Sequence, residues 1–198
     1  MNAISALVVN ELLQRNIIIS EKAEICRIGI MLILADMINF SLVLLIGILT
    51  KSFFESVAYI IVFWTVRRFS GGFHAKTHLV CRLVTVGTYV LILIASKFIN
   101  DHYIITNIIC CVFSIITMLL FAPIKHPNKE LTDKEVKANK LFAALATLFF
   151  ATVSLVLTFI NKETGLVISL ILLAISILMY IGLQTNKKRG KSNVKYCR

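Results

Sequence analysis

The residues best suited to chemistry lie in one short stretch, 67–85, with the sequence RRFSGGFHAKTHLVCRLVT. It contains two of the chain's four histidines, one cysteine, a Gly-Gly pair and four basic residues, and no Asp or Glu occurs from residue 56 to residue 100. Positive, acid-free surroundings favour the thiolate form of a cysteine, as does the positive end of a helix that begins near Thr77. A thiolate with an imidazole in reach is the minimum set of groups for nucleophilic attack on an amide. The stretch therefore predicts that Cys81 is a nucleophile.

Two histidines are candidates for the base that serves Cys81. His78 lies three residues before Cys81, so the two side chains would be neighbours on one helix. His74 lies seven residues before Cys81, about 10.5 Å along a continuous helix and beyond hydrogen-bond reach. Gly71 and Gly72 tolerate positive φ, so a loop at this point could turn His74 back towards the thiol. Spacing alone slightly favours His78 and leaves His74 open.

The pattern RR-x-x-GG-x-HA-x5-C, over residues 67–81, resembles the signature of the accessory gene regulator B (AgrB) family. Members of that family are membrane cysteine endopeptidases that process the precursor of a cyclic quorum-sensing peptide in Gram-positive bacteria. The resemblance extends to chain length, to about six hydrophobic segments and to a segment of the type AP-x-x-HPNK at 122–129. By position, it implies that the family's histidine is His74 and its cysteine is Cys81. Thr85 stands where the family often has a serine, so a hydroxyl is kept.

The resemblance also implies a reaction and a partner. Cys81, deprotonated by His74, would cleave a pheromone precursor peptide that has an amphipathic N-terminus and an acidic C-terminus. The resulting thioester would pass to an internal cysteine or serine of the precursor and close a thiolactone or lactone, provided that water is kept out. No cofactor is expected, and no metal either, because the chain has no His-Glu-x-x-His motif. Substrate binding is expected of Arg67, Arg68, Gly71, Gly72, Lys125 and Lys129.

The elements that must position these residues are membrane helices. Of the 198 residues, 58% are hydrophobic and only 16% are charged, and the mean hydropathy is +0.87. Soluble domains contain about 25% charged residues, so the composition excludes a soluble protein. It predicts an all-α polytopic membrane protein with one domain over residues 1–198.

Six apolar segments are expected to cross the bilayer. The second of them is short for a span and contains Glu55, so it crosses with tilt or local thinning of the bilayer, or dips in and returns. Residues 2–19 are expected to form an amphipathic helix in the membrane interface, and residues 184–198 a basic cytoplasmic tail. The six segments are 28–49, 53–66, 80–98, 103–121, 141–160 and 166–183.

The distribution of lysine and arginine predicts the orientation in the cell membrane. With six crossings and both termini in the cytoplasm, 17 of these residues lie in inner segments and 3 in outer loops, as the positive-inside rule requires. Without the crossing at 53–66, Arg67 and Arg68 would move outside. Because membrane topology accounts for the net charge of +11, the expected partner is the lipid bilayer and no nucleic acid is expected.

Two other functions remain open. Asp36 and Asn39 lie within an apolar segment, where an ionisable group is a functional candidate by default. Together with Glu55 they could line the path of a small transporter or exporter. The second alternative is a non-catalytic membrane scaffold. The oligomeric state is open as well, and a homodimer is one option.

Overall fold

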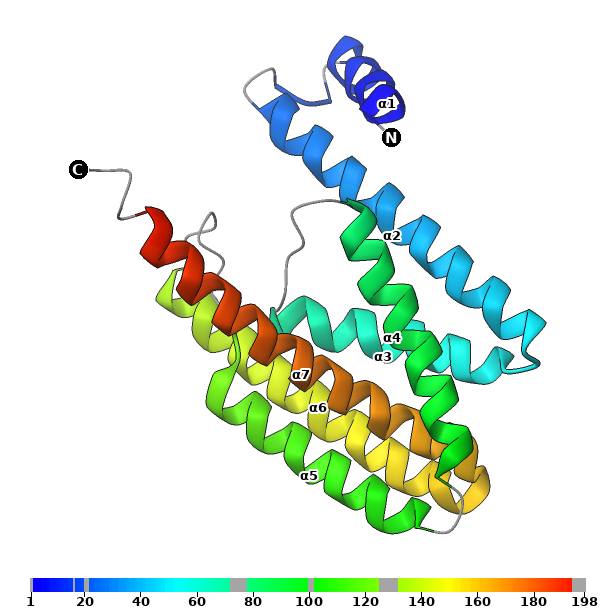
Figure 1. Cartoon of the computed structure of the whole chain (residues 1–198). Coiled ribbons are helices and arrows are strands. Elements are labelled where there is room, and N and C mark those ends of the chain that lie inside the picture. The colour runs from blue at the N-terminus through cyan, green and yellow to red at the C-terminus, as the bar shows by residue number, and fades with distance from the viewer. Residues whose placement is uncertain are drawn as a thin grey trace.

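The computed structural model describes residues 2–15, 17–19, 22–71, 78–99, 102–124 and 132–193 (Figure 1). In this part of the chain the regular elements are seven α-helices and no β-strand occurs, which confirms the predicted all-α class. The helices are α1 (Asn2–Gln14), α2 (Ala23–Leu49), α3 (Phe53–Ser70), α4 (His78–Phe98), α5 (Tyr103–Phe121), α6 (Asp133–Ile160) and α7 (Lys162–Asn193).

Five of the described helices are long and apolar enough to cross a membrane: α2, α4, α5, α6 and α7. Their outward faces carry many exposed large apolar side chains, among them Leu32, Leu83 and Phe149. A bilayer covers a face of this kind, whereas water would not favour it. The multi-pass membrane class predicted from composition is therefore confirmed.

Helix α3 differs from these five in composition. It has 18 residues, with Glu55 in its first turn and Arg67 and Arg68 in its last, and it does not meet the same criterion of length and apolarity. It packs against α2, α6 and α7. The segment expected over 53–66 is thus a helix, and its crossing of the bilayer stays a prediction.

Helix α7 is the central element of the bundle. Residues 165–172 are all buried, because α3, α4, α5 and α6 pack around this helix. Figure 1 shows α5, α6 and α7 lying side by side along most of their length. A helix that is hydrophobic on all sides is suited to such a central position.

Small and polar side chains join α5, α6 and α7. Asn107 of α5 donates hydrogen bonds to Thr158 Oγ1 and, over 3.4 Å, to the Ser154 carbonyl of α6. Ser154 Oγ donates to the Gly165 carbonyl of α7 over 2.7 Å. In lipid, polar groups must find partners within the protein, and small residues let helix backbones approach closely. The buried face of α6 accordingly consists of Ala143, Thr147, Ala151, Ser154 and Thr158.

Five helices, α2, α3, α4, α6 and α7, extend beyond the segments expected in the bilayer, and α2, α6 and α7 do so the furthest. Helix α2 begins at Ala23 instead of residue 28, and α6 begins at Asp133 instead of residue 141. Helix α7 continues to Asn193, so residues 184–193 of the expected tail are helical, and residues 194–198 lie outside the described part. These helix ends leave the expected membrane segments as predictions, because hydropathy marks the part of a helix that lies in the bilayer, whereas a helix of good helix formers continues into water.

The early start of α6 has a local cause. Thr132 and Glu135 form a capping box, in which the Thr132 N–H donates to Glu135 Oε2 over 2.9 Å and the Glu135 N–H donates to Thr132 Oγ1 over 3.4 Å. These reciprocal bonds satisfy two N–H groups that a helix start otherwise leaves without partners. The charged end of the loop after α5 is therefore the first part of α6.

The N-terminal helix is shorter than expected. Helix α1 ends at Gln14 instead of residue 19, and Arg15 Nε donates to Glu11 Oε1 over 2.7 Å beside that end. Helix α1 packs against α2 with Val9 buried and Leu7 exposed. The exposed leucine suits a helix in the membrane interface, and this placement stays a prediction.

Gly165 marks the tightest approach of α7 to α6. A Cβ at this position would lie 2.7 Å from the Cα of Thr158, so we predict that Gly165→Ala destabilises the protein by about 1–3 kcal/mol through overpacking. Gly87→Ala in α4 is the matched control, because its Cβ would meet nothing within 4 Å. Thermal unfolding in detergent measures both variants. A Gly165→Ala protein that unfolds at the wild-type temperature would contradict this packing.

Candidate active site

Cys81 lies in the first turn of α4. The helix begins at His78, within one residue of the start expected near Thr77, and the Cys81 thiol is free and half-buried. The positive end of the helix dipole is at this turn. The next residue, Arg82, has a buried Nε with no hydrogen-bond partner among the described residues. Cys81 therefore lies in the turn that holds the positive end of the helix dipole, and a basic residue follows it in the sequence.

Hydrogen bonds from α3 hold α4 at the level of Cys81. Tyr59 Oη of α3 donates to the Thr85 carbonyl over 2.7 Å, and Thr85 Oγ1 donates to the Cys81 carbonyl over 3.0 Å. One turn further along α4, Ser56 Oγ and Tyr89 Oη lie 2.6 Å apart. The side chains of all four hydrogen-bonding residues are buried. Because a buried hydroxyl needs a partner, these bonds fix how far α4 is shifted along α3.

Sequence reasoning missed Ser56, Tyr59 and Tyr89 as supporting residues. The signal that could have found them is the presence of hydroxyl groups within apolar segments, since such groups seek partners on a neighbouring helix. The sequence pattern does not tell which helix supplies the partner.

The last turn of α3 carries the two arginines expected to bind substrate. The Arg67 guanidinium lies 5.0 Å from the centre of the Phe63 ring. The Arg68 guanidinium lies 5.5 Å from the centre of the Trp64 ring. These cation–π contacts hold both groups against their own helix. A concentrated positive charge results at the end of α3.

The end of α3 is joined to the segment that follows α5. Gly71 ends α3 with a φ of 69°, and the Ile124 N–H donates to the Ser70 carbonyl over 3.0 Å. A Cβ at Gly71 would lie 2.9 Å from the Ile124 carbonyl oxygen. Positive φ and this close approach both require glycine. The structure therefore brings the first glycine of the RR-x-x-GG pattern next to the start of the AP-x-x-HPNK segment.

Four of the predicted site residues, Gly72, His74, Lys125 and Lys129, lie outside the part of the chain that the structure describes. The side chain of His78 is also outside it. The pairing of Cys81 with either histidine therefore stays a prediction.

The comparison with known proteins places the chain in a family. The family described as accessory gene regulator B matches residues 4–183, nearly the whole chain. This chain belongs to that family. The resemblance suggested by the motif at 67–81 is thereby confirmed at family level. The match to the AgrB family includes the membrane helices as well as the motif.

Relatives of this AgrB-family protein match it over most of its length. An AgrB-like protein of Listeria welshimeri is 25% identical over 170 residues, which cover 85% of this chain and 82% of the relative. An AgrB-like protein of Clostridium perfringens is 28% identical over 163 residues, which cover 77% and 76%. No solved structure gives a significant match.

The cavity that Glu55 lines in this AgrB-family protein does not include the other two polar residues of the transporter alternative. Glu55 lines a cavity of about 330 Å³, and neither Asp36 nor Asn39 contributes to it. Asp36 lies thirteen residues before the end of α2 at Leu49, about 20 Å along the helix. Asn39 is buried, and its Oδ1 has no hydrogen-bond partner among the described residues.

Gly71 offers a test of the junction between the two loops. We predict that Gly71→Ala costs about 1–2 kcal/mol, because alanine disfavours positive φ and its Cβ would press on Ile124. Gly29→Ala in α2 is the matched control, since a Cβ there would meet nothing within 4 Å. Thermal unfolding in detergent compares the two variants. If Gly71→Ala and Gly29→Ala unfold at the same temperature, the close contact between residue 71 and Ile124 would be contradicted.

Proposed function

We propose that this AgrB-family protein is a cysteine endopeptidase of the cell membrane that cleaves a quorum-sensing precursor peptide and cyclises it. The observation that carries the proposal is the place of Cys81 in a member of this family. It is a free, half-buried thiol in the first turn of α4, and His74 lies in the segment between α3 and that turn. Both chain termini would face the cytoplasm, and the reaction would take place at that face.

The first half of the reaction forms a thioester. Cys81 gives its proton to His74, and the thiolate attacks the carbonyl carbon of the scissile peptide bond. Backbone N–H groups near Gly71 and Gly72 are candidate donors to the resulting oxyanion. The C–N bond then breaks, the imidazolium protonates the leaving amine, and the C-terminal part of the precursor departs. The remaining part stays bound to the Cys81 sulfur.

The second half closes the ring. An internal cysteine or serine of the precursor gives its proton to His74 and attacks the thioester carbonyl, and Cys81 leaves and is reprotonated. When a cysteine attacks, one thioester replaces another at nearly equal energy, so hydrolysis must be suppressed. Exclusion of water suppresses it. The exposed side chains of Leu79 and Leu83, on the same turns of α4, support a lipid-covered and dry setting.

Basic residues at this end of the molecule would bind the acidic C-terminal part of the precursor. Arg67 and Arg68 end α3. Lys125 and Lys129 follow Ile124, whose N–H is bonded to the end of α3, and this supports a common basic surface for the four cations. The amphipathic N-terminal part of the precursor would lie in the bilayer beside the protein.

The nucleophile can be tested directly. We predict that Cys81→Ala abolishes cleavage, whereas Cys26→Ala, the control at another free and half-buried cysteine, leaves cleavage unchanged. The measurement is gel analysis of a tagged precursor incubated with membranes that contain each variant. The precursor to use is the short peptide encoded beside the gene, with an amphipathic start, an internal cysteine and an acidic end. Full cleavage by Cys81→Ala would refute the proposal.

The base can be identified in the same assay. His74→Ala is expected to lower the cleavage rate by about 10²-fold or more, the usual effect of losing a general base. His78→Ala is expected to remain active. Loss of activity in His78→Ala alone would transfer the role of base to that residue. Trapping of a covalent precursor adduct in wild-type protein and not in Cys81→Ala would identify the sulfur as the acceptor.

The basic surface predicts a salt-dependent substrate affinity. Arg68→Gln is expected to raise KM up to about fivefold without changing kcat, because an exposed ion pair contributes about 0.2–1 kcal/mol. The effect should shrink as ionic strength rises. Lys51→Gln, at the opposite end of α3, is the control and should leave KM unchanged. An equal KM for Arg68→Gln and wild type at low salt would remove Arg68 from the binding surface.

A further inference from the structure

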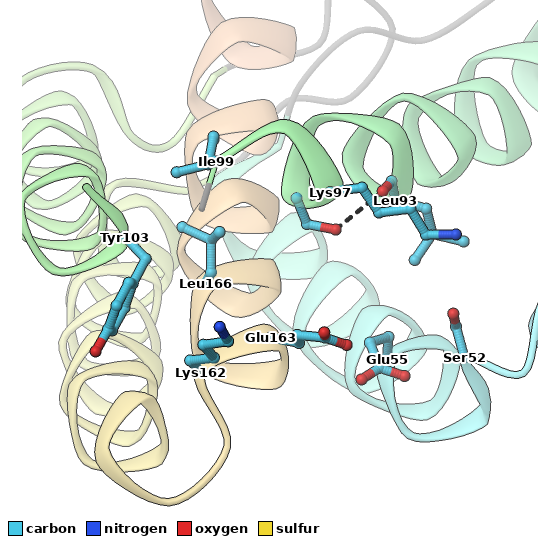
Figure 2. Close-up of a pocket in the computed structure, with 10 residues that line it drawn as sticks. Ser52, Glu55, Leu93, Lys97, Ile99, Tyr103, Lys162, Glu163 and Leu166 are labelled. Atoms are coloured by element: carbon cyan, nitrogen blue, oxygen red, sulfur yellow. Dashed lines mark hydrogen bonds between the residues drawn. The ribbon is translucent and has the colours of Figure 1, made fainter. Parts of the chain in front are cut away.

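A cavity lies at the end of the molecule away from Cys81, where α2 turns into α3 and α6 turns into α7 (Figure 2). Its volume is about 330 Å³, large enough for a small polar group. Leu93 of α4 lines it and lies twelve residues after Cys81, about 18 Å along the helix. The cavity is therefore separate from the candidate active site.

Four charged residues line this cavity. Glu55 of α3 and Glu163 at the start of α7 point their carboxylates towards each other, with Lys97 and Lys162 to either side (Figure 2). Thr164 Oγ1 donates to Glu55 Oε1 over 3.2 Å. Within the described residues none of the four forms an ion pair. Two carboxylates that face each other, with no described cation within 4 Å of either, form a favourable place for a positively charged ligand group.

A second hollow continues the cavity between α2 and α4. Its volume is about 120 Å³, and apolar side chains, including Ile46, Val90 and Ile94, make up most of its wall. Lys97 lines both hollows and so stands at their junction. Ile94 in this wall has 49% of its surface exposed, so the groove is open on its outer side, where the acyl chains of a bilayer would lie.

The order of these groups matches the order of groups in one class of lipid. We propose that the site binds a phospholipid whose head group carries a primary amine. Its ammonium lies between Glu55 and Glu163, its phosphate lies next to Lys97, and an acyl chain follows the groove between α2 and α4. Charge-assisted hydrogen bonds hold the two charged ends of the head group. A head group without an amine leaves the two carboxylates without a cation, so it binds more weakly.

Competition among lipids tests the proposal. The purified full-length protein in detergent is mixed with equal amounts of phosphatidylethanolamine, phosphatidylglycerol and phosphatidylcholine that share the same acyl chains, and bound lipid is measured by native mass spectrometry. Phosphatidylethanolamine is expected to bind about tenfold more than phosphatidylglycerol, the effect of one charge-assisted hydrogen bond. Glu55→Gln combined with Glu163→Gln is expected to remove this preference. Lys97→Met is expected to weaken binding of all three lipids.

Controls keep the result interpretable. Glu24 is an exposed carboxylate at the other end of α2, so Glu24→Gln should keep the preference for phosphatidylethanolamine. If the double variant does not fold, Glu163→Gln alone is used in its place. Soluble glycerophosphoethanolamine, which lacks acyl chains, should compete poorly. Equal binding of the three lipids by the wild type, or an unchanged preference in the glutamine variants, would show annular lipid only and overturn the proposal. Displacement by the soluble head group at equal concentration would overturn the role of the groove.

Discussion

Inside a bilayer a polar side chain has no water to bind, and this constraint organises the bundle. Several polar side chains of the apolar helices point inward and bind one another beside α7, as Asn107 and Ser154 do between α5, α6 and the Gly165 carbonyl. Small residues on α6 make the close approach feasible. The outward faces are left to leucine, isoleucine and phenylalanine, which need only lipid as a neighbour. The most apolar helix is therefore found in the centre, because it can be surrounded without leaving a polar group unsatisfied.

The same constraint connects the core to the candidate active site. Tyr59 can satisfy its buried hydroxyl at the Thr85 carbonyl, and Thr85 in turn bonds to the Cys81 carbonyl. The height of the thiol relative to the basic end of α3 is thus set by hydrogen bonds within the membrane part of the protein. At that end, the bond from Ile124 to Ser70 joins two segments that are about fifty residues apart in the chain. The motif is one continuous stretch in the sequence. In the structure, hydrogen bonds join its two helices, α3 and α4, and a further bond joins the end of α3 to the segment after α5.

The sequence predicts the helices well and their contacts poorly. Long apolar runs locate the five membrane helices because hydropathy alone decides what can lie in lipid. The start of α4 at His78 agrees with the sequence, because Thr77 is of a residue type that is common directly before a helix. The charged residues before position 141 are typical of a connection with a short helix, but the sequence does not show that this helix is continuous with the membrane helix as α6, which begins behind the capping box of Thr132 and Glu135. The pairing of Tyr59 with α4 is missed for a deeper reason: a helix that is apolar on all sides has no periodicity to show which face meets which neighbour. The pairing of His74 with Cys81 depends on a turn in the backbone, which residue types permit but do not specify.

The capping box of α6 has a mechanical consequence. The eight residues 133–140 precede the apolar part of the helix, and at 1.5 Å per residue they form a rod of about 12 Å outside the hydrocarbon layer. This rod is continuous with the helix that packs against α5 and α7, so it cannot bend at the membrane surface without breaking backbone hydrogen bonds. If a bound chain pulls on residues 133–140, the whole of α6 would therefore tilt, including its part within the bundle. A binding event at the membrane surface could thus change the packing of α6 against α5 and α7.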